Sequence, residues 1–245
     1  MAMNRPRPIF LFTDFSWSGP YVGQMIGAIV AADPHARVFN LMHDAPQMRP
    51  DLAAYLLPAC CRPLPQDAIV AAVVDPGVGG DRAALIVETA TMTFIGPDNG
   101  LLSRLPDIRR AARIDWRPAS LSASFHGRDL FAPAAARLAL GETVECTPIQ
   151  PQQIVGGDWP DDPERIIYVD AFGNLMTGVD ARNVSKNSRI VVGDQRLTYA
   201  ETFSRAAVGA PFWYVNSQGL VEIAANGRSA ATLLSLALGE RFLLQ

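Results

Sequence analysis

The chain has 245 residues, which is enough for one large domain or two small ones with an ample hydrophobic core. Hydrophobic residues make up 49% and charged residues only 18%, yet no uninterrupted apolar run reaches the roughly 18 residues of a membrane-spanning helix. The net charge of -3 argues against a nucleic-acid partner, which usually requires a basic surface.

The N-terminal residues and the cysteines predict a reduced, cytoplasmic protein. Residues 1–8 contain two prolines, and no apolar stretch with a cleavage site follows, so we expect no signal peptide. Cys60 and Cys61 are adjacent and Cys146 is the third cysteine, which suits neither a disulfide framework nor a spaced zinc site. The three histidines lack ligand spacing, so we expect no metal site.

The first half of the chain alternates short apolar runs with helical patterns. In chain order we expect a strand at residues 9–12, a helix at 21–32, a strand at 38–42, a helix at 51–60, strands at 69–74, 83–87 and 92–95, and a helix at 130–140. The last helix should end at Gly141. This alternation predicts an α/β domain, a Rossmann-like sheet layered by helices, over residues 1–150.

The second half has a different pattern. Residues 146–163 hold four prolines and three acids with little periodicity, and we interpret them as a linker. Short strands are then expected at residues 165–169, 175–179, 189–192, 196–198, 212–215, 220–224 and 242–244. Turn dipeptides such as Gly-Asn and Asn-Gly separate them. The pattern predicts a small antiparallel β-barrel domain over residues 160–245.

The most informative segment follows the apolar strand at residues 69–74. Asp75 comes directly after it, and Pro76 and three glycines fill the rest of residues 75–80 except Val78, so the backbone can approach a ligand closely. Ligands of open α/β sheets bind at the carboxyl ends of strands, which makes Asp75 a candidate site residue. An ordinary turn with an incidental aspartate explains this segment equally well.

Residues of similar chemistry recur along the chain. Asp14 follows the first predicted strand, where its carboxylate can hold a sugar diol or cap a turn. Arg82 and His126 are candidates for catalysis, although a surface arginine and a hydrogen-bonded loop histidine are the plainer interpretations. Residues 170–174 form a predicted loop, and a hairpin turn accounts for its glycine and asparagine but not for its acid and aromatic residues.

In combination these blocks resemble one family, the S-adenosyl-L-methionine (SAM) hydrolases or SAM hydroxide adenosyltransferases, which are relatives of the SAM-dependent chlorinases and fluorinases. The matching blocks are Thr13-Asp14-Phe15, residues 73–79 with Arg82, residues 97–102, Phe125-His126-Gly127-Arg128-Asp129, residues 170–174 and residues 216–219. They run in order from about residue 10 to the C-terminus. The resemblance also implies an α/β domain followed by a β-barrel.

The resemblance implies a role for each candidate residue. Asp75, Arg82 and His126 would be catalytic, and Asp14 would hold the ribose hydroxyls. Asp170 suits the ammonium of the methionyl group, while Phe172 and Asn174 suit the face and the edge of adenine. The remaining positions implied to bind substrate are Met48, Phe125, Gly127, Ser217, Ala225 and Gly227.

The implied chemistry fits these residue types. SAM carries a sulfonium cation, so a neutral thioether leaves from the ribose C5′ when water attacks, and a carboxylate or imidazole is needed to orient that water. The reaction gives adenosine and L-methionine without a metal or cofactor. In the halogenases a tyrosine stands where Asp75 stands, and in the fluorinase a hydroxyl-bearing residue replaces Gly127, so the residues here favour water over halide.

Two alternatives and three departures accompany this interpretation. The chain could bind SAM or adenosine as a sensor without catalysis, or it could transfer halide. A methyltransferase is disfavoured because no glycine-rich loop follows the first strand.

The family commonly has an acid at the position of Gly19, a lysine at that of Ile26 and an aromatic residue at that of Met48. The resemblance further implies a homotrimer whose active sites lie at subunit interfaces, a state that the low charge content also favours.

Overall fold

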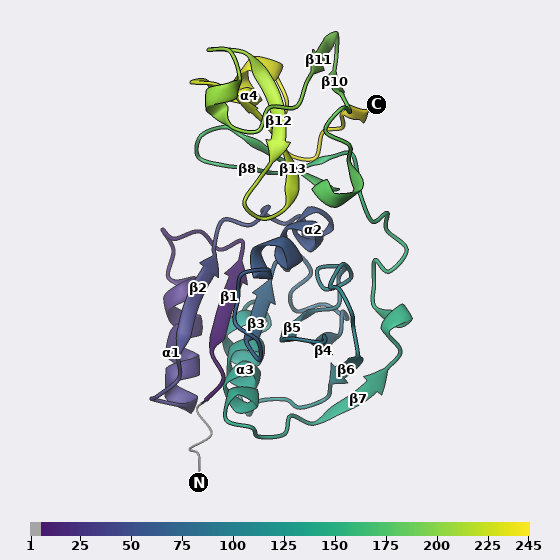
Figure 1. Cartoon of the computed structure of the whole chain (residues 1–245). Helices are drawn as coiled ribbons and strands as arrows, with labels where there is room; N and C mark the ends of the chain where they lie inside the picture. The colour runs from purple at the N-terminus through teal and green to yellow at the C-terminus, as the bar shows by residue number, and fades with distance from the viewer. Residues whose placement is uncertain (1–5) are drawn as a thin grey trace. The chain divides into compact units, whose positions relative to one another are not determined.

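The computed structural model describes residues 6–245, so part of the segment in which no signal peptide is expected lies outside the described residues. The chain divides into a first unit that ends at Asp158 and a second unit, Trp159–Gln245 (Figure 1). Each unit has its own hydrophobic core, and each is described by itself.

The first unit is built on a seven-stranded mixed sheet with the strand order β2-β1-β3-β5-β4-β6-β7. The neighbouring strands β2, β1, β3 and β5 run parallel, and β4, β6 and β7 pair antiparallel. The bounds are β1 (Ile9–Thr13), β2 (Val38–Met42), β3 (Ile69–Val73), β4 (Ala84–Glu88), β5 (Thr93–Pro97), β6 (Arg110–Ile114) and β7 (Cys146–Ile149).

Among the described residues of this unit, three helices accompany the sheet: α1 (Tyr21–Ala32), α2 (Pro50–Cys61) and α3 (Ala132–Ala139). The helix α2 begins with Pro50, whose fixed φ suits the first helical turn and whose missing N–H is not needed there. A π-helical turn, η1 (Gly127–Phe131), leads directly into α3. The helix α3 ends before Gly141, which has a φ of +77° and can turn the chain away.

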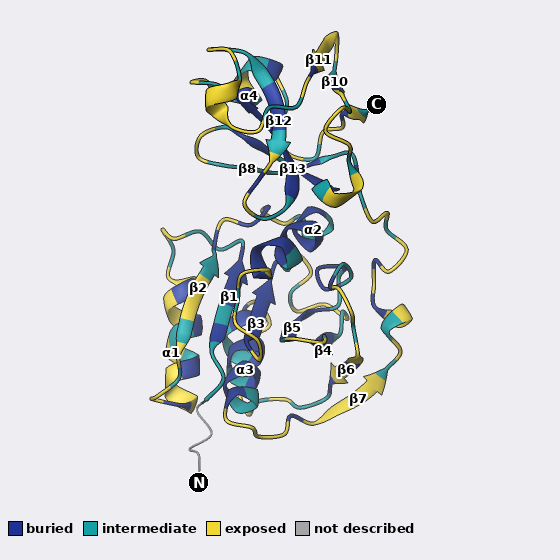
Figure 2. Ribbon diagram, in the orientation of Figure 1, coloured by how far each residue is buried: buried dark blue, intermediate teal, exposed yellow. Residues whose placement is uncertain are grey.

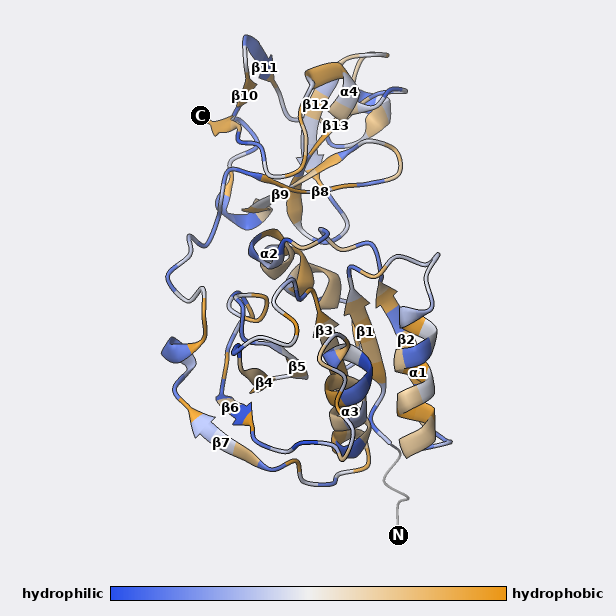
Figure 3. Cartoon of the chain, turned by 180° about the vertical axis from the view of Figure 1, so that it is seen from behind, coloured by the Kyte–Doolittle hydropathy of each residue, from blue (hydrophilic) through white to orange (hydrophobic). Residues whose placement is uncertain are grey.

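The sheet core explains the apolar runs in the sequence. Ile9, Leu11 and Ile69 on one face of the sheet pack with residues of α1 and α3, so these two helices share that face. Every residue of β3 is buried, which is why its sequence is continuously apolar rather than alternating (Figure 2). In Figure 3 β1 and β3 are drawn in hydrophobic colours, whereas β6 includes hydrophilic residues.

Parallel pairing brings two strand ends together at one edge of the sheet. In the β1–β3 pair, Thr13 lies opposite Val73. Asp14 and Asp75 follow these residues by one and two positions, so both leave the sheet at its carboxyl edge. This edge is where α/β sheets bind ligands, and the fold thus places two carboxylates from distant parts of the chain in one region.

The second unit contains two small antiparallel sheets, β12-β13-β9-β8 and β11-β10-β14, and one short helix. Isolated bridges join Arg165 to Arg241 and Tyr199 to Trp213. The core includes Trp213, Ile223 and Leu175. The elements are β8 (Ile166–Val169), β9 (Leu175–Asp180), β10 (Ile190–Val192), β11 (Gln195–Leu197), β12 (Pro211–Val215), β13 (Leu220–Ala225), α4 (Ala230–Leu234) and β14 (Leu243–Leu244). Single 3-10 turns occur in this unit at η3 (Ala181–Asn183) and η4 (Phe203–Arg205), and another, η2 (Pro151–Gln153), lies in the first unit after β7.

The expected α/β character and the antiparallel strands of the second half are confirmed, with corrections. The expected linker is wrong in its first four residues, because Cys146–Ile149 form β7 beside β6. The strand β6 was not expected, because its two arginines obscure the apolar pattern of a strand. Both of them, Arg110 and Arg113, are exposed to solvent. The helix α4 was also missed.

Candidate active site

The centre of the site is an ion pair between two side chains that leave the sheet edge close together. The Nε atom of Arg82 donates to both carboxylate oxygens of Asp75 at 3.0 Å, and its Nη2 atom donates to Oδ2. Only 4% of the Asp75 side chain and 11% of the Arg82 side chain are exposed. A pair this buried and this well matched fixes the orientation of the carboxylate.

His126 completes this cluster from a different part of the chain. The Nη2 atom of Arg82 donates to Nδ1 of His126 at 2.9 Å. Because a guanidinium can only donate, Nδ1 must be unprotonated, and the neutral imidazole then carries its proton on Nε2. Burial, followed by the nearby positive charge of Arg82, lowers the pKa of His126, which favours the same neutral form.

Glycine allows the two loops that carry these residues to meet. Gly79 has a φ of +81°, and a Cβ atom there would lie 2.2 Å from the carbonyl oxygen of Ala123. The turn after β3 therefore packs directly against the loop that precedes His126. That loop is closed by Asp129, whose carboxylate accepts a hydrogen bond from the backbone N–H of Ser122 at 2.9 Å.

Asn99 anchors the end of β3 from the neighbouring segment. Its Nδ2 atom donates to the carbonyl oxygen of Val74 at 2.9 Å, and its Oδ1 atom accepts from the N–H of Leu101. The Pro-Asp-Asn-Gly segment singled out in the sequence thus holds the strand end from which Asp75 projects. Its role in this geometry is one of support.

Asp14 lies at the same edge, on the turn after β1. Its Oδ2 atom accepts a hydrogen bond from the backbone N–H of Met48 at 2.9 Å. Partial burial, with a smaller contribution from the charge of Asp75, raises the pKa of Asp14. The Met48 side chain is 72% exposed, so its defined contact with the site is made through the backbone.

A cavity of about 180 Å³ opens beside Asp75 and His126. Three aromatic rings form one wall, with Phe125 in edge contact with Phe15 and Tyr21 at centroid distances of 5.7 and 5.3 Å. Gly127 also lines the cavity, and a Cβ atom at this position would meet the Phe125 ring at 3.0 Å and the sulfur of Met25 at 3.3 Å. The cavity therefore combines an apolar wall with two polar groups.

The second unit has its own pocket, of about 660 Å³, which gathers five of the expected residues: Asp170, Phe172, Asn174, Ala225 and Gly227. Phe172 is 80% exposed and presents its ring to the outside. The Asp170 carboxylate accepts hydrogen bonds from the backbone N–H groups of Phe172 and Asn174, and from the Asn174 Nδ2 atom at 2.9 Å. Asp170 thereby organises the hairpin turn, and the turn interpretation of this loop is also correct.

The same pocket contains residues that sequence reasoning missed, namely Phe203, Tyr214, Arg228 and Ser229. Tyr214 pairs across β12–β13 with Glu222, and its hydroxyl donates to the Glu222 carboxylate. Glu222 is 2% exposed, and burial raises its pKa. The signal was present in the sequence, because a hairpin turn centred on Gln218 places these two residues opposite each other.

Ser217 is not brought to this pocket. It lies on the turn between β12 and β13, while Ala225 is the last residue of β13 and pairs with Pro211 at the other end of the hairpin. Ser217 is exposed there, next to Asn216, whose Oδ1 atom organises the turn. The structure thus separates Ser217 from Phe172 and Asn174 by the length of a strand.

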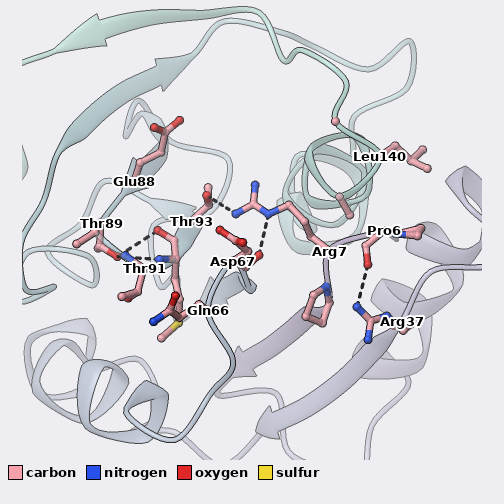
Figure 4. A pocket seen from close by; sticks show the side chains of 15 residues that line it. Pro6, Arg7, Arg37, Gln66, Asp67, Glu88, Thr89, Thr91, Thr93 and Leu140 are labelled. Atoms are coloured by element: carbon pink, nitrogen blue, oxygen red, sulfur yellow. Dashed lines mark hydrogen bonds between the residues drawn. The ribbon is translucent and has the colours of Figure 1, made fainter. Parts of the chain in front are cut away.

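A further hollow, of about 650 Å³, lies at the opposite, amino-terminal edge of the large sheet (Figure 4). Arg7 spans it, donating to the carbonyl oxygen of Asp67 at 2.7 Å and to the hydroxyl of Thr93 at 2.8 Å. Arg37 donates to the carbonyl oxygen of Pro6. The Arg37 bond ties the segment before β1 to the start of β2, and the Arg7 bonds tie it to β3 and β5, which is a structural role.

Within residues 6–245, no three histidine, cysteine or acidic side chains are grouped so that they could hold a metal ion. In the same range, none of the helices combines the length and the apolar character needed to cross a bilayer.

Comparison with known protein families finds two matches that together span most of the chain. Residues 9–147 match the SAM hydroxide adenosyltransferase N-terminal domain, and residues 164–243 match the SAM hydroxide adenosyltransferase C-terminal domain. Both matches fall within the units that the structure separates.

Individual relatives and a solved structure agree with these matches. The (R)-S-adenosyl-L-methionine hydrolase of Thermus thermophilus is 35% identical, over 94% of this chain and 96% of that protein. The protein of the same name from Salinispora arenicola is 35% identical over 94% of each chain. The crystal structure of an uncharacterized conserved protein from Thermotoga maritima superimposes with a TM-score of 0.87 at 26% identity, covering 97% of this chain and all of that one.

Proposed function

Because this chain belongs to the SAM hydroxide adenosyltransferase family, we propose that it is an enzyme that hydrolyses SAM to adenosine and L-methionine. Relatives that are 35% identical over most of the chain are named as (R)-S-adenosyl-L-methionine hydrolases. The observation that carries the proposal is the Asp75–Arg82–His126 cluster beside an apolar cavity at the carboxyl edge of the sheet.

The proposed reaction is a displacement at the ribose C5′. The water oxygen forms a bond to C5′, the bond between C5′ and sulfur breaks, and its electron pair stays on sulfur as a neutral thioether. One water proton must be taken up as the new bond forms. The sulfonium is already a good leaving group, so the step requires no metal or other cofactor.

Asp75 is the better candidate for orienting the water and accepting its proton. Each oxygen of a carboxylate can accept two hydrogen bonds, so acceptor capacity remains after Arg82 is bound. His126 accepts from Arg82 through Nδ1, and its Nε2 atom is then a donor. In this tautomer His126 can donate to the attacking oxygen and hold it in line, while Asp75 receives the proton.

The apolar wall should accelerate this step. A water molecule with hydroxide character meets a cation, so charge is neutralised as the transition state forms. A dry site strengthens the attraction between these charges relative to bulk water. The rings of Phe15, Tyr21 and Phe125 supply such surroundings and offer aromatic faces to the sulfonium.

The remaining parts of the substrate are assigned by chemistry. Asp14, which retains acceptor capacity beyond its bond to Met48, would hold the ribose diol. Phe172, with its exposed ring, would stack on adenine, and Asn174 and the backbone of Ala225 and Gly227 would contact its edge. Asp170 would attract the methionyl ammonium.

We also propose that the protein is a cytoplasmic homotrimer in which neighbouring subunits complete each site. The division of ligand-type residues between two units, and the exposed rings of Trp17 and Phe172, support a shared site. Cys60 and Cys61 are buried thiols rather than a disulfide, which supports a reducing compartment. The two bridges that join the small sheets support the interpretation of the second unit as a closed β-barrel.

A product assay tests the proposed function. Purified protein is incubated with SAM in a metal-chelating buffer, with and without chloride, and the products are separated by chromatography. We expect adenosine and methionine in equal amounts under both conditions. Formation of 5′-chloro-5′-deoxyadenosine would indicate halide transfer, and binding of SAM without turnover would indicate a sensor.

A further inference from the structure

His43 is a fully buried histidine that the proposed chemistry does not use. It lies just after β2, beside the end of β1. Its Nε2 atom is 2.9 Å from Oδ1 of Asn40, and its Nδ1 atom is 2.8 Å from the Thr13 hydroxyl. Thr13, also fully buried, immediately precedes Asp14.

These contacts have a defined direction. The Oδ1 atom of Asn40 can only accept, so the imidazole proton is on Nε2, and Nδ1 accepts the hydrogen of the Thr13 hydroxyl. The Thr13 oxygen is then oriented to accept from the backbone N–H of Phe15, at 3.3 Å. Burial lowers the pKa of His43 and favours the neutral imidazole that this chain of bonds requires.

Further bonds tie the same two turns together around Asp14. The N–H of Ser16 donates to the carbonyl oxygen of His43 at 2.6 Å, and the N–H of Ala45 donates to the carbonyl oxygen of Thr13 at 3.1 Å. The N–H of Met48 donates to the Asp14 carboxylate. Ser16 and Met48 both have positive φ angles, 62° and 54°, so the two turns adopt conformations that need support.

We propose that His43, acting through the Thr13 hydroxyl, is a positioning residue that sets the Asp14 carboxylate to receive the 2′,3′-diol of the ribose. The inference rests on the proposed function, because it takes the ligand to be an adenosine derivative. His43 contacts no substrate in this scheme. The Trp17 ring packs edge to face with the imidazole at a centroid distance of 4.6 Å, so it covers His43 and keeps it in place.

The test measures recognition of the diol rather than activity alone. Dissociation constants for adenosine and 2′-deoxyadenosine are determined by calorimetry, and their ratio reports the bond between Asp14 and the 2′-hydroxyl. Wild type should prefer adenosine by roughly tenfold or more, the range of a charge-assisted hydrogen bond. Thr13→Val keeps the side-chain shape but removes the hydroxyl, and the preference should fall to about threefold or less.

Three further variants separate positioning from general stability. Thr13→Ser keeps a hydroxyl and should keep the preference. Thr177→Val removes an equally buried hydroxyl, which donates to Val221 at 2.8 Å in the second unit, and should leave the ratio unchanged. Asn40→Ala changes an exposed residue, so the protein should still fold. This variant removes the bond that fixes the imidazole proton on Nε2 of His43, so the preference for adenosine over 2′-deoxyadenosine should fall.

An unchanged ratio in both Thr13→Val and Asn40→Ala would overturn the proposal, as would an equal loss in Thr177→Val. A wild-type protein that binds both nucleosides equally would overturn it too. Failure of the proposed function looks different: the nucleoside preference and its response to Thr13→Val would persist while SAM remained unhydrolysed.

Discussion

At the scale of single residues, the guanidinium of Arg82 determines the state of its neighbours. It orients the Asp75 carboxylate, and it forces the neutral His126 to carry its proton on Nε2. Its contact with the Phe131 ring, at 5.4 Å from the centroid, holds it from a third direction. Lysine could not replace it, because an ammonium lacks the planar fork that reaches both partners.

Replacing Asp75 by asparagine should remove chemistry but leave binding. The amide cannot take a proton from water, so we expect kcat to fall by at least about 100-fold while the dissociation constant for adenosine stays within a few-fold. Steady-state kinetics and calorimetry provide the two measurements. Asp67→Asn is the matched control, since Asp67 precedes β3 at the opposite edge and its φ of 62° suits asparagine. Near-normal turnover by Asp75→Asn would contradict the assigned role.

The dependence of activity on pH should follow His126. Burial and Arg82 lower the pKa of His126 from its ordinary 6.5, so the neutral, active form persists above the lowered value. We expect kcat/KM to be level at neutral pH and to fall as the pH drops through that lowered pKa. Protonation of Asp14, whose pKa is raised from 3.8, should deepen the loss at lower pH. A midpoint at or above 6.5 would show that the imidazole is not held neutral as described.

At the scale of elements, the site depends on a strand end and two loops that touch through glycine. The turn after β3 carries Asp75 and Arg82, and the loop before η1 carries His126. Their backbones lie close together at Gly79, where an added Cβ atom would lie 2.2 Å from the Ala123 carbonyl oxygen. The π-helical turn η1 places Gly127 against Phe125 immediately afterwards, which is a position where such turns often mark functional sites.

Gly79→Ala should therefore disrupt both stability and activity. Gly141→Ala is the control, because Gly141 also has a positive φ but has no atom within 4 Å of an added Cβ. The control should cost about 1–2 kcal/mol in the free energy of unfolding. Gly79→Ala should cost roughly 1–3 kcal/mol more, since its Cβ would overlap the Ala123 carbonyl. Denaturant unfolding and turnover rates measure both effects, and equal values for the two variants would argue against the close contact.

Local patterns predicted most elements of the first unit but not its edge. The apolar runs of β1, β2 and β3 and the period of α1 are visible without tertiary context. The strand β6 has the sequence Arg-Ala-Ala-Arg-Ile, which lacks the alternation of a strand, and β7 contains Pro148. The strand β6 therefore depends on pairing with β4 and β7, and β7 depends on pairing with β6. The short helix α4 rests on its cap, where the Ser229 hydroxyl accepts from the N–H of Thr232.

Part of the candidate site could be predicted from the sequence. Asp14 and Asp75 are candidates because each follows a predicted strand, and the family resemblance adds weight to them and to His126. The structure brings Asp75 and His126 together through Arg82. Tyr214 and Glu222 were missed because their meeting depends on strand register. His43 was dismissed as a metal ligand, and its partnership with Thr13 follows from the parallel pairing of β1 and β2.

At the scale of the whole molecule, the proposed function assigns substrate binding to both units. The first unit would supply Asp14 and the reacting groups, and the second would supply Phe172. Phe172→Ala should weaken adenosine binding by about 1–3 kcal/mol, the range of one lost stacking contact. Val208→Ala, at a residue of the second unit that is 90% exposed, is the control and should bind normally. Calorimetry distinguishes the two, and unaltered binding by Phe172→Ala would contradict the adenine assignment.

Mixing two defective variants tests whether subunits share sites. If each site combines the first unit of one subunit with the second unit of another, then Asp75→Asn and Phe172→Ala should complement each other. At low SAM concentration, roughly a quarter of the sites in an equal mixture should be intact, by random association of subunits. No gain in activity after verified subunit exchange would reject a shared site, as would full activity in a monomer.

In the proposed reaction, water activated at Asp75 attacks the ribose C5′ of SAM. This attack is measured most directly by hydrolysis in water enriched in the heavy oxygen isotope, followed by mass spectrometry of both products. We expect one heavy oxygen in adenosine, at the 5′ position, and none in methionine, with the rate strongly reduced in Asp75→Asn. Adenosine that lacks the heavy oxygen, or labelled homoserine with 5′-methylthioadenosine in place of the expected products, would contradict attack at C5′.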